Sequence, residues 1–404
     1  MIAQQAAKKR IKHLSQKGRV LVFGGSDQSQ LLVASSFERL PYGDVKDLQL
    51  GAECPDQIVG FLSYDDMVTQ NFDGSFFYRV LEGLLFDFKT GKHLVIGNLE
   101  AHISLDLISR LQDLPHRPLE ENIRIDLQPL QSDDSYLEAC RLALHGIENG
   151  RFYQLNLLRF FKISVTSRDH FVDHWLQNSG DHGALLMDDE REIFSYSPEQ
   201  FVASNFSKTM RVLETYPIKG TRRRSPDPNE DSRLKADLET SPKDRAELSM
   251  IIDLMRNDLA RISKKNTVRV DDPGQVCSYP TVHHLVAKIS GEILEDLTLG
   301  QLFSILPAGS ITGAPKVEVM SAISELEIRK RGFFMGSAFH LNSSGDFKST
   351  VMIRTALKIG DEYQYAAGSG IVVKSIPEDE MAEIYVKCRV LSGDQDGSTL
   401  HNFK

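Results

Sequence analysis

Two pairs of acidic residues with helical spacing are the first candidates for chemistry. Asp244 and Glu247 lie three residues apart in one predicted helix, and Glu380 and Glu383 lie three apart in another. Residues at positions i and i+3 share one side of a helix. Carboxylates at the edge of a buried face are costly unless a cation lies among them, and Mg²⁺ takes hard oxygen ligands. Acids are also favoured in first helical turns by the helix dipole alone, so the spacing leaves both interpretations open.

A lysine at the end of a predicted strand is the second candidate. The stretch ETYPIKGT (214–221) places Lys219 between an isoleucine and a glycine. A lysine most often lies on a solvated surface, and this one taken alone favours that interpretation. A lysine enclosed by protein would instead have a lowered pKa and could act as a nucleophile, although nearby carboxylates would oppose the shift.

The elements predicted around Lys219 are a hairpin and a long helix. FVAS and MRVLETYPI predict two antiparallel strands that end at Lys219, and a polar loop over 222–233 follows them. The segment SPKDRAELSMIIDLMRNDLARI predicts a helix with Ser241 as N-cap, Pro242 at its first position and one apolar stripe. Asp244 then lies where a capping box places an acid.

Further elements are predicted on both sides of this region. Residues 129–150 predict a helix that Asp133 or Asp134 caps and Gly150 ends. Residues 335–373 predict three or four antiparallel strands, and PEDEMAEIYVKCRVLSG predicts a last helix. Short strands such as RVLVFGG occur in the first third. Strands and helices without regular alternation predict an α+β fold.

Composition narrows the class of protein. The 404 residues are 41% hydrophobic and 25% charged, as in globular proteins, and the length permits two cores or one large core. The net charge of −9 argues against a nucleic-acid partner, and acids follow the one basic run, at 222–224, which predicts a solvated loop.

Cysteine spacing and hydropathy bear on the compartment. The four cysteines are widely spaced and form no CxxC pair, which favours reduced thiols over a disulfide framework or a zinc site. The first residues, MIAQQAAKKRIKH, lack the apolar core of a signal peptide, and no apolar run approaches the length of a membrane span. We therefore expect a cytoplasmic protein without membrane contact.

Taken together, these segments resemble the chorismate-utilising enzymes, which include anthranilate, aminodeoxychorismate, isochorismate and salicylate synthases. The matching segments, in the family's order, are SPEQ (197–200), PIKGT (217–221), DRAELSMIIDLMRNDLAR (244–261), SYPTVHHLVAKISGEI (278–293), LPAGSITGAPK (306–316), VMIRTA (351–356), AAGSGIV (366–372) and PEDEMAEIYVK (377–387). RFYQLNLLRFF (151–161) also fits the family pattern. Any single motif would mean little, whereas so many in order are highly specific.

The resemblance also implies an organisation. It predicts an α+β fold like that of anthranilate synthase component I, in which two antiparallel sheets face each other with helices outside. Residues 129–395 are expected to form the chorismate-binding catalytic region. Residues 1–128, which match loosely, would be the N-terminal part of the same body, and 396–404 would be a C-terminal tail.

Lys219 discriminates within the family. PIKGT resembles the pattern of aminodeoxychorismate synthase component I, whereas the other synthases carry PxAGT or a near variant at this place. The resemblance implies that Lys219 attacks C2 of chorismate, that the 4-hydroxyl leaves, and that ammonia then adds at C4 and expels the lysine. The amine must be neutral to attack, and a lysine in water, with a pKa near 10.4, is under ~0.1% free base at pH 7.

The resemblance assigns roles to the remaining candidates. Glu199 matches a general acid that protonates the departing 4-hydroxyl, and His284 matches an active-site histidine. Arg354, on the predicted strand VMIRTA, matches an arginine that binds the enolpyruvyl carboxylate. The residues expected to lie against the substrate are Gly220, Thr221, Ser310, Phe334, Arg354, Gly368, Ser369 and Gly370. The residues that match the family's Mg²⁺ cluster are Asp244, Glu247, Glu380 and Glu383.

Four further positions carry expectations by analogy. Gln154 stands where water-adding relatives carry a lysine base, which argues against isochorismate or salicylate synthase activity. Phe334 stands where many relatives have a tyrosine that contacts the substrate, so that one contact would be weaker. Lys316 is expected near the pocket, and Lys288 is expected to be structural.

The ammonia source and the alternatives complete the expectations. The chain has no G-x-C-x-G nucleophile elbow, so we expect a separate glutamine amidotransferase subunit to supply ammonia. The product would be 4-amino-4-deoxychorismate, on the way to 4-aminobenzoate and folate. The alternatives are anthranilate synthase component I and a non-catalytic scaffold that binds chorismate-like acids. A Mg²⁺ phosphotransferase is disfavoured because no GxxxxGK[ST] loop occurs.

Overall fold

The computed structural model describes most of the chain. The described residues are 7, 11–12, 14–16, 18–24, 30–54, 56–87, 92–97, 125–164, 168–179, 182–206, 210–279 and 282–392. The expected C-terminal tail, 396–404, lies outside them. Among the helices within these ranges, none has both the length and the apolarity to cross a membrane.

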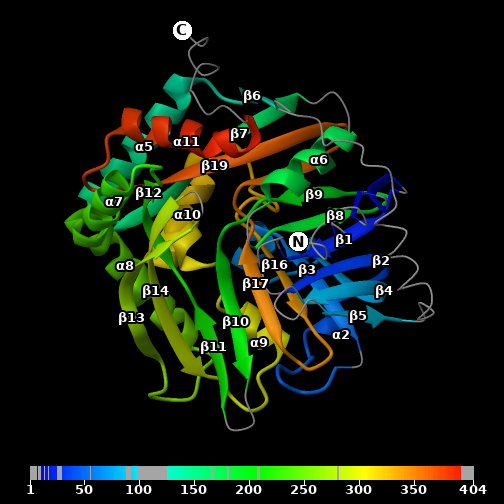
Figure 1. The fold of residues 1–404 in the computed structure, drawn as a ribbon. Coiled ribbons are helices and arrows are strands. Elements are labelled where there is room, and N and C mark those ends of the chain that lie inside the picture. Colours follow the sequence, from blue (N-terminus) through cyan, green and yellow to red (C-terminus); the bar gives the residue numbers. More distant parts are fainter. Residues whose placement is uncertain are drawn as a thin grey trace.

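Helices gather at the outside of a large sheet (Figure 1). They are α2 (Tyr42–Val45), α3 (Tyr64–Thr69), α5 (Asp133–Glu148), α6 (Arg168–Asn178), α7 (Pro228–Thr240), α8 (Pro242–Ala260), α9 (Leu299–Phe303), the 3₁₀ turn η1 (Gly309–Ile311), α10 (Lys316–Leu326) and α11 (Pro377–Ser392).

The strands of the described residues pair into one antiparallel sheet. They are β1 (Val20–Phe23), β2 (Gln30–Leu40), β3 (Gln57–Leu62), β4 (Phe76–Asp87), β5 (Lys92–Ile96), β6 (Asp126–Pro129), β7 (Gln154–Ser164), β8 (Ala184–Met187), β9 (Glu192–Ser195), β10 (Gln200–Phe206), β11 (Arg211–Thr215), β12 (Ile218–Arg223), β13 (Arg269–Ser278), β14 (Val282–Glu292), β15 (Gly313–Ala314), β16 (Ser337–Leu341), β17 (Phe347–Val351), β18 (Thr355–Ile359) and β19 (Glu362–Val372).

The order of the strands shows how the sheet folds back on itself. Its first end is β13 paired with β14, and β14 pairs on its other side with both β12 and β11. The pairing then runs through β10, β17, β16, β3, β4, β2, β1, β8, β9 and β18 to β19 and β7. The short strands β6 and β15 pair with the free side of β7 and complete this end of the sheet. The two ends approach each other, since the Lys219 amine of β12 lies beside Gly370 of β19. The predicted α+β fold is confirmed, and the two facing sheets are the two halves of this one.

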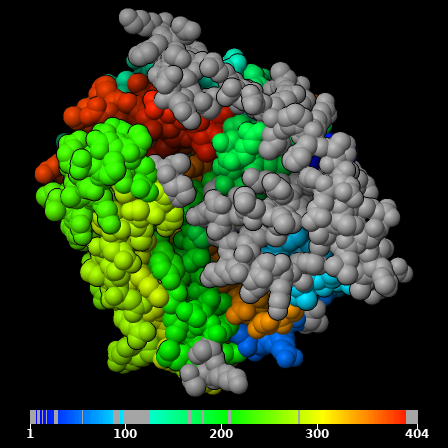
Figure 2. Space-filling view, viewed as in Figure 1, coloured from blue at the N-terminus to red at the C-terminus, as the bar shows by residue number. Residues whose placement is uncertain are grey.

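Helices cover the two ends of the sheet. Helices α7 and α8 pack on β12, β13 and β14, while α5 and α11 pack on β19 (Figure 1). In the space-filling view the surfaces of α7 (green) and α11 (red) face each other at the upper left of the molecule (Figure 2). The two acidic pairs lie on α8 and α11, so each pair is carried by a helix that covers a different end of the sheet.

The caps of the predicted helices are partly as expected. Ser241 caps α8 by accepting a hydrogen bond from the Asp244 N–H, and Pro242 stands in its first turn, which confirms that prediction. The predicted N-cap of α5 was wrong, because Ser132 caps this helix and not Asp133 or Asp134. Gly150, with φ +71°, follows the end of α5 as predicted.

The expected polar loop over 222–233 was also wrong in part. The predicted hairpin is formed by β10 and β11, but β11 ends at Thr215, and Lys219 is the second residue of the next strand, β12, instead of the end of the hairpin. Strand β12 continues to Arg223, and α7 begins at Pro228 after Asp227, whose carboxylate caps it. Charged residues at the end of the strand pair with those of the helix, as Arg223 does with Glu230 and Arg224 with Asp231, so polarity did not indicate a loop. The strands predicted over 335–373 and the last helix are confirmed as β16–β19 and α11.

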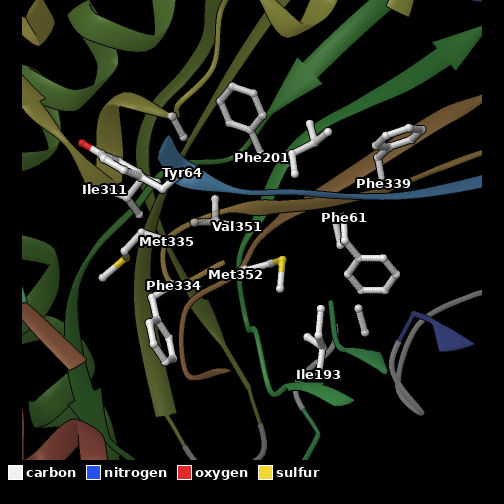
Figure 3. Close-up of a cluster of buried hydrophobic side chains, with 14 of the residues drawn as sticks. Phe61, Tyr64, Ile193, Phe201, Ile311, Phe334, Met335, Phe339, Val351 and Met352 are labelled. Carbon is white, nitrogen blue, oxygen red and sulfur yellow. The ribbon is translucent and has the colours of Figure 1, made fainter. Parts of the chain in front are cut away.

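A buried apolar core supports the sheet between its two ends. Figure 3 shows part of it, with the buried side chains of Phe339 and Val351 on one face of the paired strands and that of Phe61 on the other. Full burial of such a side chain stabilises a fold by about 1.5–3 kcal/mol. This packing fixes the position of the strands that carry the site.

Candidate active site

A cavity of about 500 Å³ lies where β12, β14, β19, α8 and α11 meet. Most of the residues predicted for the site line it: Glu199, Lys219, Gly220, Thr221, Asp244, Glu247, His284, Ser310, Arg354, Gly368, Gly370, Glu380 and Glu383. A cavity with several converging polar and titratable groups is typical of a ligand site.

A β-bulge aims Lys219 into the cavity. Lys219 pairs with Leu285 and Thr221 pairs with His284, the next residue of β14, so Gly220 is an extra residue in β12. Gly220 has φ +76°, which a residue with a Cβ atom rarely adopts. Bulges of this kind occur next to active sites, where they redirect a side chain.

The surroundings of Lys219 favour its neutral form. Enclosure by protein lowers the pKa of the amine, and the Lys387 cation lowers it further. Glu247, Glu199 and Glu383 act in the opposite direction, but burial outweighs them. Lys219 as a residue is half-buried, and it is among the residues that line the cavity. A buried lysine of this kind can serve as a nucleophile.

Glu199 is a carboxyl group held toward its protonated form. Burial raises its pKa, while Ser310, Lys219 and the other cations of the cavity oppose that shift. The Ser310 hydroxyl donates a hydrogen bond to Oε1 of Glu199 at 2.9 Å. A carboxylic acid that stays protonated near neutral pH can act as a general acid.

His284 lies on β14 beside the bulge. Its Nδ1 and the Thr221 hydroxyl are 2.9 Å apart, and Tyr279 packs edge-on against the ring at 5.6 Å. Burial lowers the pKa of the imidazole, and the nearby Arg354 cation acts in the same direction. A neutral ring in this position supports the Gly220 turn and faces the cavity.

Arg354 is not in a strand, contrary to prediction. Strand β17 ends at Val351 and β18 begins at Thr355, and Arg354 between them has φ +50°. Its carbonyl accepts a hydrogen bond from the Tyr196 N–H at 3.0 Å. A left-handed conformation in a non-glycine residue costs about 1–3 kcal/mol and recurs at functional sites. Here it accompanies a guanidinium that lines the cavity.

Ser369 does not line the cavity. Successive residues of a strand face opposite sides, so Gly368 and Gly370 border the cavity while Ser369 points away. Ser369 is fully buried, and its hydroxyl lies 3.4 Å from the Tyr136 hydroxyl. A Cβ atom on Gly370 would lie 3.9 Å from Nζ of Lys219, so this glycine leaves room beside the amine.

Phe334 also lies away from the cavity. Its ring is buried in the apolar cluster of Figure 3 and packs edge-on against Phe160, with centroids 5.9 Å apart. The next residue, Met335, lines the cavity instead. A tyrosine at 334 could not reach the cavity from this position without leaving the cluster.

The four predicted metal ligands share the cavity wall without converging on one point. Each is paired with a neighbouring side chain: Asp244 with Arg222 (3.1 Å), Glu247 with Lys243 (4.0 Å), Glu380 with Ser375 (2.6 Å) and Glu383 with Lys387 (2.7 Å). Among the described residues, no three acids, histidines or cysteines are grouped as ligands of one ion. Their hard oxygen donors suit Mg²⁺, but these partners would have to give way to it.

The sequence interpretation missed several lining residues. Lys387 lies one turn after Glu383 on α11 and donates to the Gly368 carbonyl at 2.7 Å, so helical spacing could have found it. Asn156 follows Gln154 by two residues in β7 and therefore faces the same side. Arg222 lines the cavity although its triplet predicted a solvated loop.

Two lysines expected by analogy are structural. Lys316 binds Asp258 at 2.7 Å and the Ile305 carbonyl at 3.0 Å, and it is not among the residues that line the cavity. Lys288 pairs with Glu214 at 2.9 Å, as a structural lysine should.

Known proteins are similar to this chain in sequence. Aminodeoxychorismate synthase component 1 of Escherichia coli (strain K12) is 37% identical over 265 residues, which cover 65% of this chain and 58% of that protein. Anthranilate synthase component 1 of Salmonella typhimurium is 29% identical over 387 residues, covering 93% of this chain and 71% of that protein.

A solved structure has the same architecture. The crystal structure of anthranilate synthase component I from Streptococcus pneumoniae superposes with a TM-score of 0.72 at 25% identity, covering 92% of this chain and 90% of that one. The chain also matches the chorismate binding enzyme family over residues 6–393. This chain therefore belongs to the chorismate binding enzymes.

Proposed function

We propose that the protein is an aminodeoxychorismate synthase component that converts chorismate and ammonia to 4-amino-4-deoxychorismate. The observation that carries the proposal is the pairing of two groups in one cavity. Lys219 has an amine whose pKa is lowered by burial, and Glu199 has a carboxyl group whose pKa is raised by burial. Groups pushed in opposite directions are the expected signature of a nucleophile and a general acid.

The proposed first step forms a covalent intermediate. Nζ of Lys219 attacks C2 of the chorismate ring, the ring double bonds shift, and the bond from C4 to its hydroxyl oxygen breaks. Glu199 gives its proton to that oxygen, which leaves as water. The attacking nitrogen loses one proton and remains attached to C2 as a secondary amine.

The second step reverses the shift. Ammonia attacks C4, the double bonds return, and the bond between C2 and Lys219 breaks. The departing lysine takes back one proton, and the new amine at C4 loses one. The overall change is chorismate plus ammonia to 4-amino-4-deoxychorismate plus water.

The cations of the cavity suit a substrate with two carboxylates. Arg354 can bind one of them through two parallel N–H donors, and Lys387 provides a second positive charge on the same wall. We propose that Asp244, Glu247, Glu380 and Glu383 hold a Mg²⁺ ion. When bound, that ion would neutralise the ring carboxylate of chorismate.

We further propose that a separate glutamine amidotransferase subunit supplies the ammonia and that the product leads to 4-aminobenzoate and folate. This rests on the absent nucleophile elbow and on the Escherichia coli relative, whose name marks it as one component of a synthase. All four cysteines are free thiols, which supports a cytoplasmic location.

Anthranilate synthase component I is the second candidate. It is favoured by the Salmonella relative, which aligns with nearly the whole chain. Product analysis separates the two functions. The purified protein, incubated with chorismate, Mg²⁺ and ammonium, should form 4-amino-4-deoxychorismate, whereas anthranilate formed without an added lyase would overturn the proposal.

Intact-mass analysis tests the covalent step. Protein incubated with chorismate and Mg²⁺ but without ammonia should gain the mass of chorismate minus water, and peptide mapping should place the adduct on Lys219. Lys219→Ala should lose the adduct. Lys243→Ala is the matched control, because this lysine also lines the cavity but its side chain is 80% exposed. An adduct on another residue would contradict the mechanism.

A further inference from the structure

Two residues of the cavity wall have a backbone conformation that few residues adopt. Among the described residues, the non-glycine residues with a positive φ are Gln70, Asn266, Met335 and Arg354. Gln70 ends α3, and asparagine tolerates this region well. Met335 (φ +60°) and Arg354 (φ +50°), in contrast, both line the cavity. The proposed function uses Arg354 and leaves Met335 without a role.

A methionine gains nothing from this conformation by itself. The Cβ atom of an L-residue is crowded in the left-handed region, and glycine avoids that strain. The turn that contains Met335 has a glycine at its other left-handed position, Gly332 (φ +57°), where a Cβ atom would meet nothing within 4 Å. A non-glycine residue that keeps a strained conformation beside a cavity is a candidate for a functional contact.

Packing on both sides holds Met335 in this conformation. The residue before it, Phe334, has its ring buried in the apolar cluster. The residue after it, Gly336, lies against β3, where a Cβ atom would collide with the Leu62 carbonyl oxygen. Because both neighbours are packed, the change in chain direction falls on Met335.

Backbone hydrogen bonds connect Met335 to the segment that carries Arg354. The Met335 N–H donates to the Met352 carbonyl at 3.1 Å, and the Met352 N–H donates to the Gly336 carbonyl at 2.8 Å. Arg354 follows Met352 by two residues, and Ile353 between them also lines the cavity. Met335 and Arg354 therefore belong to one part of the cavity wall, which combines apolar side chains with a cation.

This combination suits a carboxylate that is attached to an apolar group. The Arg354 guanidinium can bind the carboxylate through two parallel N–H donors. Met335 is only 8% exposed, and its unbranched thioether side chain adapts to irregular shapes. The enolpyruvyl group of chorismate has the matching composition, because its carboxylate and its terminal methylene are bonded to the same carbon atom.

We propose that Met335 is a specificity-determining residue that packs against the enolpyruvyl methylene of chorismate, next to the carboxylate that Arg354 binds. The inference rests on the proposed function, because that function makes chorismate the substrate. A ligand that has the ring carboxylate but lacks the enolpyruvyl group does not reach Met335. The residue thus favours ligands with this group over simpler ring acids.

Two unreactive ligands that differ only in this group test the contact. They are 3-hydroxybenzoate and its enolpyruvyl ether, neither of which carries a 4-hydroxyl that could leave. Their affinities are measured by isothermal titration calorimetry in the presence of Mg²⁺, for the wild-type protein and for Met335→Gly, Met335→Ala and Met335→Leu. The glycine and alanine variants should bind the ether about tenfold more weakly or worse and bind 3-hydroxybenzoate within about twofold of wild type. Met335→Leu keeps the side-chain volume, so both affinities should stay within about threefold of wild type.

Urea unfolding of the same variants tests the strained conformation on which the contact depends. Alanine at an ordinary position is more favourable than glycine, because it restricts the unfolded chain. At φ +60° the order should reverse, so Met335→Gly should have a higher urea midpoint than Met335→Ala. Met187→Ala is the matched control, since Met187 of β8 is fully buried and is not among the residues that line the cavity. It should lower the urea midpoint and leave both affinities unchanged.

The outcomes separate this inference from the proposed function. Amination of chorismate by the wild-type protein with ammonium tests the proposed function by itself, and its absence would remove the basis for this inference as well. If amination occurs and Met335→Gly binds the ether as tightly as wild type, only the role of Met335 is overturned. Equal weakening of both ligands would also overturn it, because the effect would not be specific to the enolpyruvyl group. A higher urea midpoint for Met335→Ala than for Met335→Gly would contradict the left-handed conformation and the inference with it.

Discussion

Replacing Gly220 by alanine is the sharpest test of how the site is built. Gly220 is the extra residue of the β12 bulge, with φ +76°. An L-residue with a Cβ atom in the left-handed region costs about 1–2 kcal/mol. That strain arises before any contact with the rest of the protein is considered.

The new methyl group would also collide with both helices that cover β12. Its position is 2.8 Å from Cδ1 of Leu238 in α7 and 2.8 Å from Cγ of Asp244 in α8. Carbon atoms rest at about 3.5–4.0 Å, so each neighbour would have to move by about 0.7 Å. Overpacking of this kind costs about 1–3 kcal/mol, which brings the expected loss of stability to about 2–5 kcal/mol.

Urea unfolding followed by circular dichroism measures that loss. Gly43→Ala in α2 is the matched control, because its Cβ atom would meet nothing within 4 Å and alanine is favoured in helices. We expect Gly43→Ala to be neutral or stabilising by up to about 1 kcal/mol. A Gly220→Ala protein within about 0.5 kcal/mol of wild type would refute the geometry inferred for the bulge.

Three further predictions concern the cavity. Gly370→Ala should fold nearly as well as wild type, because its methyl group meets only the end of the flexible Gln154 side chain at 3.2 Å. The methyl group would take up space beside the Lys219 amine that the substrate ring needs, so kcat/KM should fall about 10–100-fold, and unchanged turnover would contradict this. Ser310→Ala removes a hydrogen bond that favours the ionised form of Glu199, so the pKa of that carboxyl group should rise further. The alkaline limb of the kcat/KM profile should then move to higher pH, and a move to lower pH would show that Glu199 is not the acid. Treatment with EDTA should abolish turnover and added Mg²⁺ should restore it; full activity in EDTA would exclude the proposed ion.

Local sequence signals predicted the elements that carry the site well. Ser241 and Pro242 start α8 as predicted, because an N-cap and a first-turn proline act within one helical turn. The acidic pairs on α8 and α11 both reach the cavity for the same reason, since helical spacing fixes which side chains share a face. The prediction of a loop over 222–233 was wrong in part because charged residues are as compatible with a surface helix as with a loop.

The side chains of strand residues were harder to assign to the cavity, because neighbouring residues of a strand face opposite sides of the sheet. Ser369 was expected against the substrate together with its glycine neighbours, but the pleat of β19 turns it toward Tyr136. Phe334 was expected to contact the substrate, and the apolar cluster holds it instead. Alternation along the strand separates Ser369 from its glycine neighbours, but only the tertiary packing decided which side of β19 meets the cavity and that the apolar cluster holds Phe334.

By itself the sequence determined that Lys219 stands directly before a glycine in an extended segment and that two helices each present a pair of acids one turn apart. These follow from spacing and from the conformations that single residues allow. Only the tertiary structure decided that the two ends of one long sheet meet, so that an amine on β12 is enclosed beside β19 and its pKa is lowered. The physical reason is that desolvation depends on everything that surrounds a group, and here the surroundings come from residues more than a hundred positions apart in the chain.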